Sequence, residues 1–140
     1  MTTFVVDASV AIKWVVREPG TDEAMSLLKI FEARHVKLVA PRQIAEEVAS
    51  ALSKAFRQKR ISKREAEHAF QEFEAHAPKL NDDVNLVGLA LALSLQHQIS
   101  LWDCLYLALA IDEGADLITA DQRFYRSVSR HYPFVKLLGS

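Results

Sequence analysis

Two carboxylates follow apolar, strand-like runs of this sequence. Asp7 comes directly after Phe4-Val5-Val6, and Asp121 comes directly after the run LITA. A carboxylate buried at the end of a strand is costly unless it is paired or its pKa shifts. In open α/β sheets, functional sites lie beyond the carboxyl ends of the strands. We therefore expect the two acids at one sheet edge. The alternatives are a turn residue after the strand for Asp7 and, for Asp121, an N-cap of the following helix, which is the favoured interpretation when that residue is taken alone.

Two further acids lie on predicted helices, next to their buried faces. At about 100° per residue, Glu47 falls on the flank of the apolar stripe of residues 43–58, whereas Glu46 points to solvent. Asp103 shares a face with the apolar residues of the helix predicted for 100–111. The alternatives are a boundary residue whose head reaches water for Glu47, and a carboxylate favoured by the helix dipole for Asp103.

One divalent cation would account for all four acids together. Clustered carboxylates repel one another and resist ionising without a counter-charge. Magnesium, held by a few carboxylates, waters and substrate phosphate, suits such a half-open cage. It would activate a water and stabilise charge at a scissile phosphate. The four acids of this hypothesis are Asp7, Glu47, Asp103 and Asp121.

The elements that must position these acids alternate between strands and helices. Near-continuous apolar strands separated by helices indicate a parallel sheet covered on both faces, an α/β sandwich. Strands are predicted for residues 3–6, 36–40, 116–120 and 134–138. Helices are predicted for residues 21–34, 43–58, from a capping box at Ser62 and Glu65, from Asp82 or Asp83 to 95, for 100–111 and for 122–129.

Length and composition limit the possible functions. A chain of 140 residues, half of them apolar and a quarter charged, indicates one globular domain over 1–140. The formal net charge of −1 means that any nucleic-acid contact must use a local patch. The single cysteine, Cys104, excludes an internal disulfide and is interpreted as a core residue, as Trp14 and Trp102 are interpreted as packing residues. Without a signal-like or membrane-length apolar segment, the expected location is cytoplasmic, with no membrane contact.

Four stretches, in this order, resemble the PIN-domain ribonucleases and, among them, the VapC-type toxins of toxin–antitoxin pairs. Each stretch matches a segment that carries one acid in that family. The first is similar to its opening strand, the next two to acid-bearing helices and the last to a strand end: VVDASVAIKW, APRQIAEEVASAL, LWDCLYLALA and LITADQRF.

The resemblance implies a PIN-like three-layer α/β/α sandwich and hydrolysis of RNA that leaves a 5′-phosphate, dependent on Mg²⁺ or Mn²⁺. It places catalysis and metal binding on the same four acids. It also implies that Ser9 and Thr119 orient ligands or waters beside the first and fourth acids. Ser50 departs from the family, which often has Asn there. Homodimers, and silencing by a small antitoxin that inserts a segment into the active-site groove, are implied as well.

Basic residues supply two local patches. Six positive charges fall within residues 54–64, and arginines at 123, 126 and 130 follow the fourth acid. Both groups could contact RNA phosphates, the first could contact an antitoxin, and either could be ordinary solvated surface. The RNA-binding candidates are Lys54, Arg57, Arg60, Arg123 and Arg126.

Two other functions compete with a metal-dependent endoribonuclease. One is a catalytically silent PIN-like module that only binds an antitoxin or RNA, although such a module has no need of four costly carboxylates. The other is a phosphatase with Asp7 as covalent nucleophile. A phosphatase of the haloacid-dehalogenase type would have a second Asp two residues on, where this chain has Ser9.

Overall fold

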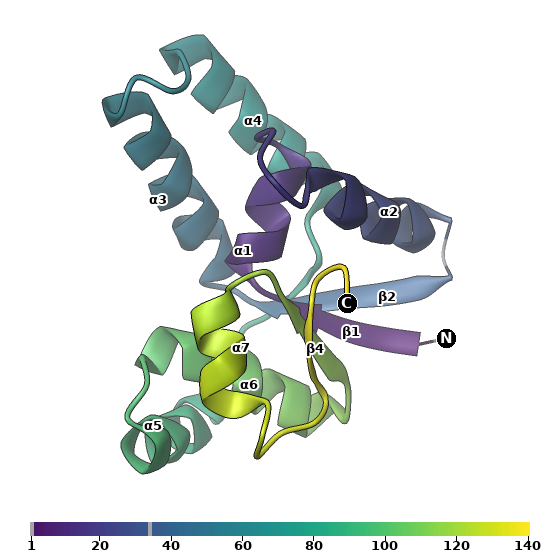
Figure 1. The fold of residues 1–140 in the computed structure, drawn as a ribbon, viewed down its shortest axis with the longest axis vertical. Helices are drawn as coiled ribbons and strands as arrows, with labels where there is room; N and C mark the ends of the chain where they lie inside the picture. Colours follow the sequence, from purple (N-terminus) through teal and green to yellow (C-terminus); the bar gives the residue numbers. More distant parts are fainter. Residues whose placement is uncertain (1, 34) are drawn as a thin grey trace.

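Five short parallel strands form the centre of the structure, a computed structural model that describes residues 2–33 and 35–140 (Figure 1). Their order in the sheet is β3-β2-β1-β4-β5. The chain therefore adds β2 and β3 on one side of β1, and then β4 and β5 on the other side. The strand order reverses between β1 and β4. The strands are β1 (Thr2–Val6), β2 (Val36–Pro41), β3 (Lys79–Asn81), β4 (Asp116–Thr119) and β5 (Val135–Leu137).

Helices cover both faces of this sheet, as the mixed strand and helix pattern predicted. In the described part of the chain, no helix is long and apolar enough to cross a membrane. The helical elements are α1 (Ala8–Ala11), the 3₁₀ helix η1 (Ile12–Trp14), α2 (Thr21–Glu32), α3 (Ile44–Arg57), α4 (Lys63–His76), α5 (Leu86–His97), α6 (Leu101–Glu113) and α7 (Gln122–Val128).

Two hydrophobic clusters fix the helices to the two faces of the sheet. Neighbouring residues of a strand point to opposite faces, so Val5 belongs to the larger cluster with α6, whereas Val6 belongs to the smaller cluster with α2. Both valines are fully buried. The end of β1 is thereby held between two packed layers, which leaves the residue that follows it little freedom to move.

The predicted elements are confirmed in type, and their ends differ by a few residues. The strand predicted for 36–40 includes Pro41, and the predicted helix end at Arg34 lies outside the described residues. Neither Asp82 nor Asp83 caps α5, which begins after Asn85, because the Asp83 side chain instead accepts from the Asn85 amide.

Three short elements were not predicted: β3, α1 and η1. Strand β3 has three residues, two of them exposed, so it carries no alternating pattern. Helix α1 has four residues and depends on a cap by Asp7 rather than on apolar periodicity.

The capping box of α4 gives a stability prediction. Ser62 Oγ accepts from the Glu65 amide at 3.0 Å, and Glu65 Oε1 accepts from the Ser62 amide at 2.9 Å. Ser62→Ala should lower the free energy of unfolding by about 1 kcal/mol, measured by urea denaturation. Ser127→Ala, which removes an exposed hydroxyl bonded only to the Arg123 carbonyl, should change it by less than about 0.5 kcal/mol. Equal losses in the two variants would contradict the role of the box.

Candidate active site

The reversal of strand order brings the first and fourth acids to one crevice. β1 pairs with β4 in register Val6↔Ile118, and the Asp7 amide donates to the Ile118 carbonyl at 3.4 Å. Asp7 directly follows β1, and Asp121 lies two residues after β4. The expectation that both lie at the carboxyl edge of the sheet is confirmed, at the point where such sheets form their sites.

Asp7 is held by four donors. Ser9 Oγ donates to its Oδ1 and Thr119 Oγ1 donates to its Oδ2, both at 2.5 Å. The amides of Ser9 and Val10 donate to Oδ1 at 3.1 and 3.4 Å, so Asp7 also caps α1. The side chain is buried, and its orientation is therefore fixed from two directions.

The two hydroxyl groups also tie Asp7 to the segment that carries Asp121. The Ala120 amide donates to Ser9 Oγ at 2.8 Å, and the Asp121 amide donates to Thr119 Oγ1 at 3.1 Å. The exposed Asp121 side chain caps α7 through Oδ1, which accepts from the Phe124 amide at 3.1 Å. The cap interpretation of Asp121 is correct, and it engages only one carboxylate oxygen.

Glu47 and Asp103 are half-buried in the first turns of α3 and α6. Glu46 is exposed, so helical phase separated the two glutamates correctly. The Tyr106 hydroxyl donates to Glu47 Oε2. Sequence reasoning missed this contact, although a hydroxyl one turn after Asp103 in an apolar helix was the available signal.

The four acids act on one another electrostatically. Burial raises the pKa of Asp7 to about 6, against the hydrogen bonds from Ser9 and Thr119. Burial raises the pKa of Glu47 to about 7, against the Tyr106 hydrogen bond, and the charges of Asp7 and Asp103 add to the rise. Burial, with the charge of Asp121, also raises the pKa of Asp103. Together these interactions link all four acids into one group.

The donor chemistry of this group fits a hard divalent cation. Among the described residues, no Lys, Arg or His forms an ion pair with any of the four acids. Carboxylates that repel one another in a partly dry site and lack a counter-charge are the oxygen ligands that magnesium and manganese take. As they stand, no three His, Cys, Asp or Glu side chains in the described ranges are grouped closely enough to hold a metal ion.

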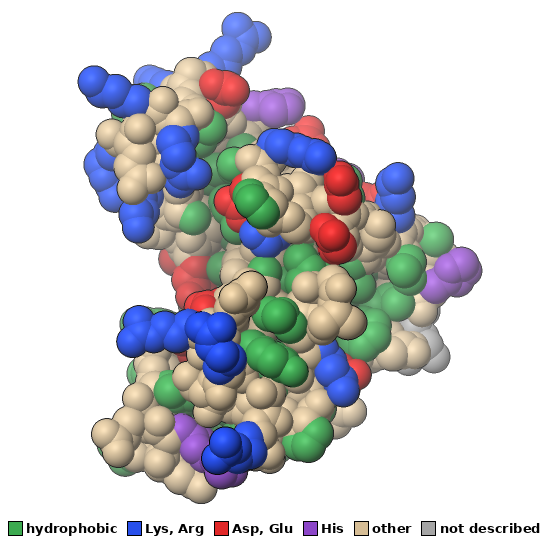
Figure 2. Space-filling view, in the orientation of Figure 1, with side chains coloured by type: hydrophobic (Ala, Val, Ile, Leu, Met, Phe, Trp, Pro, Cys, Tyr) green, Lys and Arg blue, Asp and Glu red, His purple; other side chains and the backbone are tan. Residues whose placement is uncertain are grey.

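Basic side chains flank the acidic group without entering it. Figure 2 shows acidic side chains in a notch between α3 and α7, with Lys and Arg over α7 and at the α3–α4 corner. The α7 residues Arg123 and Arg126, and Lys54, Arg57 and Arg60 at the corner, are exposed. Along α3, the corner lies about 15 Å from Glu47.

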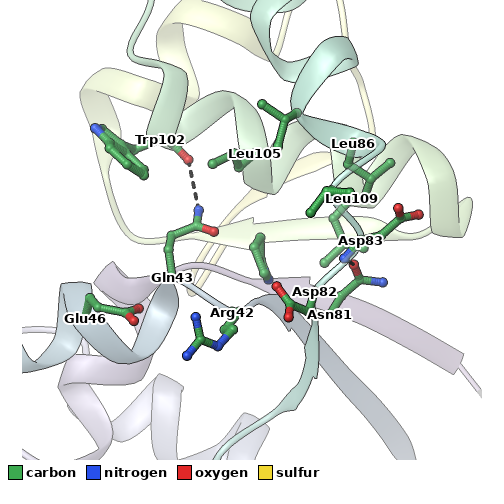
Figure 3. A pocket seen from close by; sticks show the side chains of 13 residues that line it. Arg42, Gln43, Glu46, Asn81, Asp82, Asp83, Leu86, Trp102, Leu105 and Leu109 are labelled. Atoms are coloured by element: carbon green, nitrogen blue, oxygen red, sulfur yellow. Dashed lines mark hydrogen bonds between the residues drawn. The ribbon is translucent and has the colours of Figure 1, made fainter.

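A separate pocket of about 380 Å³ lies next to Glu46 and Trp102, which directly precede two of the four acids (Figure 3). Gln43, which precedes α3, Glu46 of α3 and Trp102 of α6 line it, and Gln43 Nε2 donates to the Trp102 carbonyl at 3.4 Å. The packing role expected for Trp102 is wrong, since 58% of this residue is exposed. Trp14 does pack, with Nε1 donating to the Ala24 carbonyl at 2.9 Å.

Comparison with known proteins identifies the family. The family model described as PIN domain matches residues 4–128, which is most of the chain. The chain belongs to the PIN domain family. No curated protein sequence matches this PIN domain.

Solved structures share the fold of this PIN domain at low sequence identity. PAE2754 of Pyrobaculum aerophilum has a TM-score of 0.68 and 20% identity, over 90% of this chain and 79% of the other. VapC20 of Mycobacterium tuberculosis is described as a toxin that cleaves the sarcin–ricin loop. It has a TM-score of 0.67 and 14% identity, over 89% of this chain and 95% of the other. VapBC2 of Rickettsia felis, solved with a DNA fragment of its promoter, has a TM-score of 0.63 and 18% identity, over 97% of each chain. These likenesses establish the fold.

The raised pKa of Asp7 predicts how stability depends on pH without metal. Since this pKa is about 6 in the folded protein and 3.8 for an ordinary Asp, the folded state binds more protons between these values. Stability should therefore fall as pH rises from 4 towards 7, by up to about 3 kcal/mol for this group. Melting temperatures in EDTA should fall less steeply for Asp7→Asn than for wild type. The exposed control Asp112→Asn should keep the wild-type slope, and an unchanged slope in Asp7→Asn would contradict the prediction.

Proposed function

We propose that this PIN domain is a divalent-metal-dependent endoribonuclease, the toxin of a VapBC-type toxin–antitoxin pair. One observation carries the proposal. Asp7 follows the strand at which the order reverses, the charges of neighbouring acids add to the raised pKa values of Asp7, Glu47 and Asp103, and none of the three has a cationic partner among the described residues. Such a group repels itself at neutral pH and is stabilised by a bound cation.

In this proposal the four acids hold Mg²⁺ or Mn²⁺, and each is oriented by its surroundings. Ser9 and Thr119 fix both oxygens of Asp7, the α7 cap fixes one oxygen of Asp121, and Asp103 approaches from the first turn of α6. When bound, the cation would supply the positive charge that activates water and stabilises a scissile phosphate. The acids would bind the cation, and through it they would keep the reacting phosphate at the notch.

RNA is the proposed substrate because its backbone suits the charges around the notch. The candidates Lys54, Arg57, Arg60, Arg123 and Arg126 are exposed and can meet phosphates on either side of the acids. The structurally similar VapC20 is described as a toxin that cleaves the sarcin–ricin loop. An RNA substrate makes the cytoplasm the proposed place of action.

A small antitoxin is the proposed protein partner. Structures similar to this chain include a toxin–antitoxin complex of Klebsiella pneumoniae, with a TM-score of 0.61 and 19% identity, over 97% of this chain and 96% of the other. The uncompensated acids of the notch would attract a basic segment, and an Arg or Lys inserted there would take the place of the cation. Such a segment would silence the site by neutralising it.

Cleavage of RNA tests the proposed activity. Wild type should cleave structured or single-stranded RNA with Mg²⁺ or Mn²⁺ and lose this activity in EDTA. Asp7→Asn should be at least about 100-fold slower, because it removes one charge from the cation site and keeps the shape of the side chain. Rates are measured by gel separation of labelled fragments.

Asp112→Asn, an exposed change of the same kind, serves as the control and should cleave at the wild-type rate. Activity that survives EDTA, or full activity of Asp7→Asn, would contradict a metal-dependent nuclease. RNA binding without cleavage by wild type would favour the catalytically silent module instead.

We further propose a homodimer through the outer face of α5. This helix contains no Asp, Glu, Lys or Arg. Leu91 and Leu95, on the side opposite the buried Ala90 and Leu93, are 51% and 71% exposed, and Val84, in the turn before α5, is 75% exposed. A surface without cations does not suit RNA, whereas low charge is typical of permanent homodimer interfaces.

A second copy is the best complement of this face. Small residues, Gly88 and Ala92, alternate on it with the large Leu91 and Leu95, so two antiparallel α5 helices related by a two-fold axis can interlock. The apolar stripe continues through Val84, which lines the pocket beside Trp102.

A charge on this face should separate the two copies. Leu91→Asp should shift the protein from dimer to monomer in sedimentation velocity at micromolar concentration, because the interface would bury an unpaired carboxylate. Ile111→Asp, at a 39% exposed residue near the end of α6, should remain dimeric. A monomeric wild type, or a dimeric Leu91→Asp, would contradict this assignment of the face.

A further inference from the structure

Tyr106 stands out because its buried hydroxyl serves one of the candidate metal ligands. The side chain is 1% exposed, in the middle of the buried face of α6. Its hydroxyl donates to Glu47 Oε2, and this is the one hydrogen bond that the Glu47 side chain makes to the described residues. Oε1 of the same carboxylate accepts no hydrogen bond from this described part of the chain.

This hydroxyl lies where three acid-bearing segments meet. Tyr106 comes one turn after Asp103 on α6, and it contacts Glu47 of α3. The backbone amide of Ala8, next to Asp7, lies near enough to the hydroxyl to oppose the rise of its pKa that burial causes. A shift of any one segment would therefore change the position of the Glu47 carboxylate relative to the other two acids.

A buried tyrosine needs an acceptor in any case, so packing alone is the competing explanation. A backbone carbonyl would satisfy the hydroxyl without burying part of a charge. The acceptor here is instead a half-buried carboxylate, in a region from which neighbouring acids repel it. Tyr132 offers the contrast, because its hydroxyl pairs with His97 Nε2 at 2.7 Å, away from the four acids.

We propose that Tyr106 is a positioning residue that holds Glu47 through Oε2 and leaves Oε1 to a divalent cation. The proposal rests on the proposed function, and no step of the reaction is assigned to Tyr106 itself. Groups that orient metal ligands in this way typically change metal affinity by about 10–100-fold when removed.

Tyr106→Phe tests this role, since it removes only the hydroxyl. Manganese affinity is measured from the rise of the melting temperature with Mn²⁺ concentration, which needs no catalysis. Tyr106→Phe should weaken Mn²⁺ binding about tenfold and lower the cleavage rate at low Mn²⁺, with partial rescue at high Mn²⁺. Tyr132→Phe, the matched loss of a bonded hydroxyl, should keep wild-type Mn²⁺ affinity.

A double-mutant cycle separates positioning from packing. If Tyr106 acts through Glu47, then Tyr106→Phe should have no further effect on Mn²⁺ affinity in a Glu47→Gln background. Additive losses would overturn the proposal. Should Tyr106→Phe be too unstable to measure, Glu47→Asp, which withdraws the carboxylate from the hydroxyl by one methylene, should weaken Mn²⁺ binding in its place, and wild-type affinity in that variant would overturn the proposal.

The outcomes also separate this inference from the proposed activity. Wild-type Mn²⁺ affinity in Tyr106→Phe, with normal metal-dependent cleavage by wild type, would overturn the positioning role and leave the nuclease intact. A different result is that wild type binds Mn²⁺ and cleaves no RNA, while Tyr106→Phe weakens Mn²⁺ binding only when Glu47 is present. That result would support the positioning role and contradict the proposed nuclease activity.

Discussion

The burial of the Asp7 carboxylate is the constraint on which the rest of the site depends. Four donors orient it, yet its pKa remains raised, so the hydrogen bonds do not fully replace the water that burial removes. Glu47 and Asp103 add negative charge to the same region. A site that repels itself in this way is stable near neutral pH when a proton or a cation is shared among its members, and the surrounding helices preserve the arrangement by packing.

Much of the site could be predicted because its acids depend on patterns that a sequence carries. Strand ends located Asp7 and Asp121, and helical phase distinguished Glu47 from Glu46. The missed features depend on contacts between distant segments. The link between Tyr106 and Glu47 joins residues 59 positions apart, and the exposure of Trp102 follows from how α3, α5 and α6 leave a pocket between them. Strand β3 was missed because three residues cannot carry a period.

Two regions of the surface, the notch and the outer face of α5, differ in their chemistry. The notch is acidic and flanked by arginines and lysines, whereas the outer face of α5 is apolar and uncharged. Charge gives orientation and long-range attraction to a phosphate backbone, and apolar area gives a lasting contact between protein surfaces. The pocket beside Trp102 adjoins both regions. Val84 lines it on the apolar side, and Glu46, which directly precedes Glu47, lines it on the side of the notch.

The reversal of strand order has a consequence for the newly made chain. Thr119 Oγ1 bonds a carboxylate that was synthesised 112 residues earlier, and β4 must insert beside β1 before that contact exists. A chain that ends before β4 contains β1 and β2 but lacks Thr119, one of the four donors that orient Asp7. A ribosome that has not yet made β4 therefore carries a chain in which Asp7 still lacks the donor to its Oδ2.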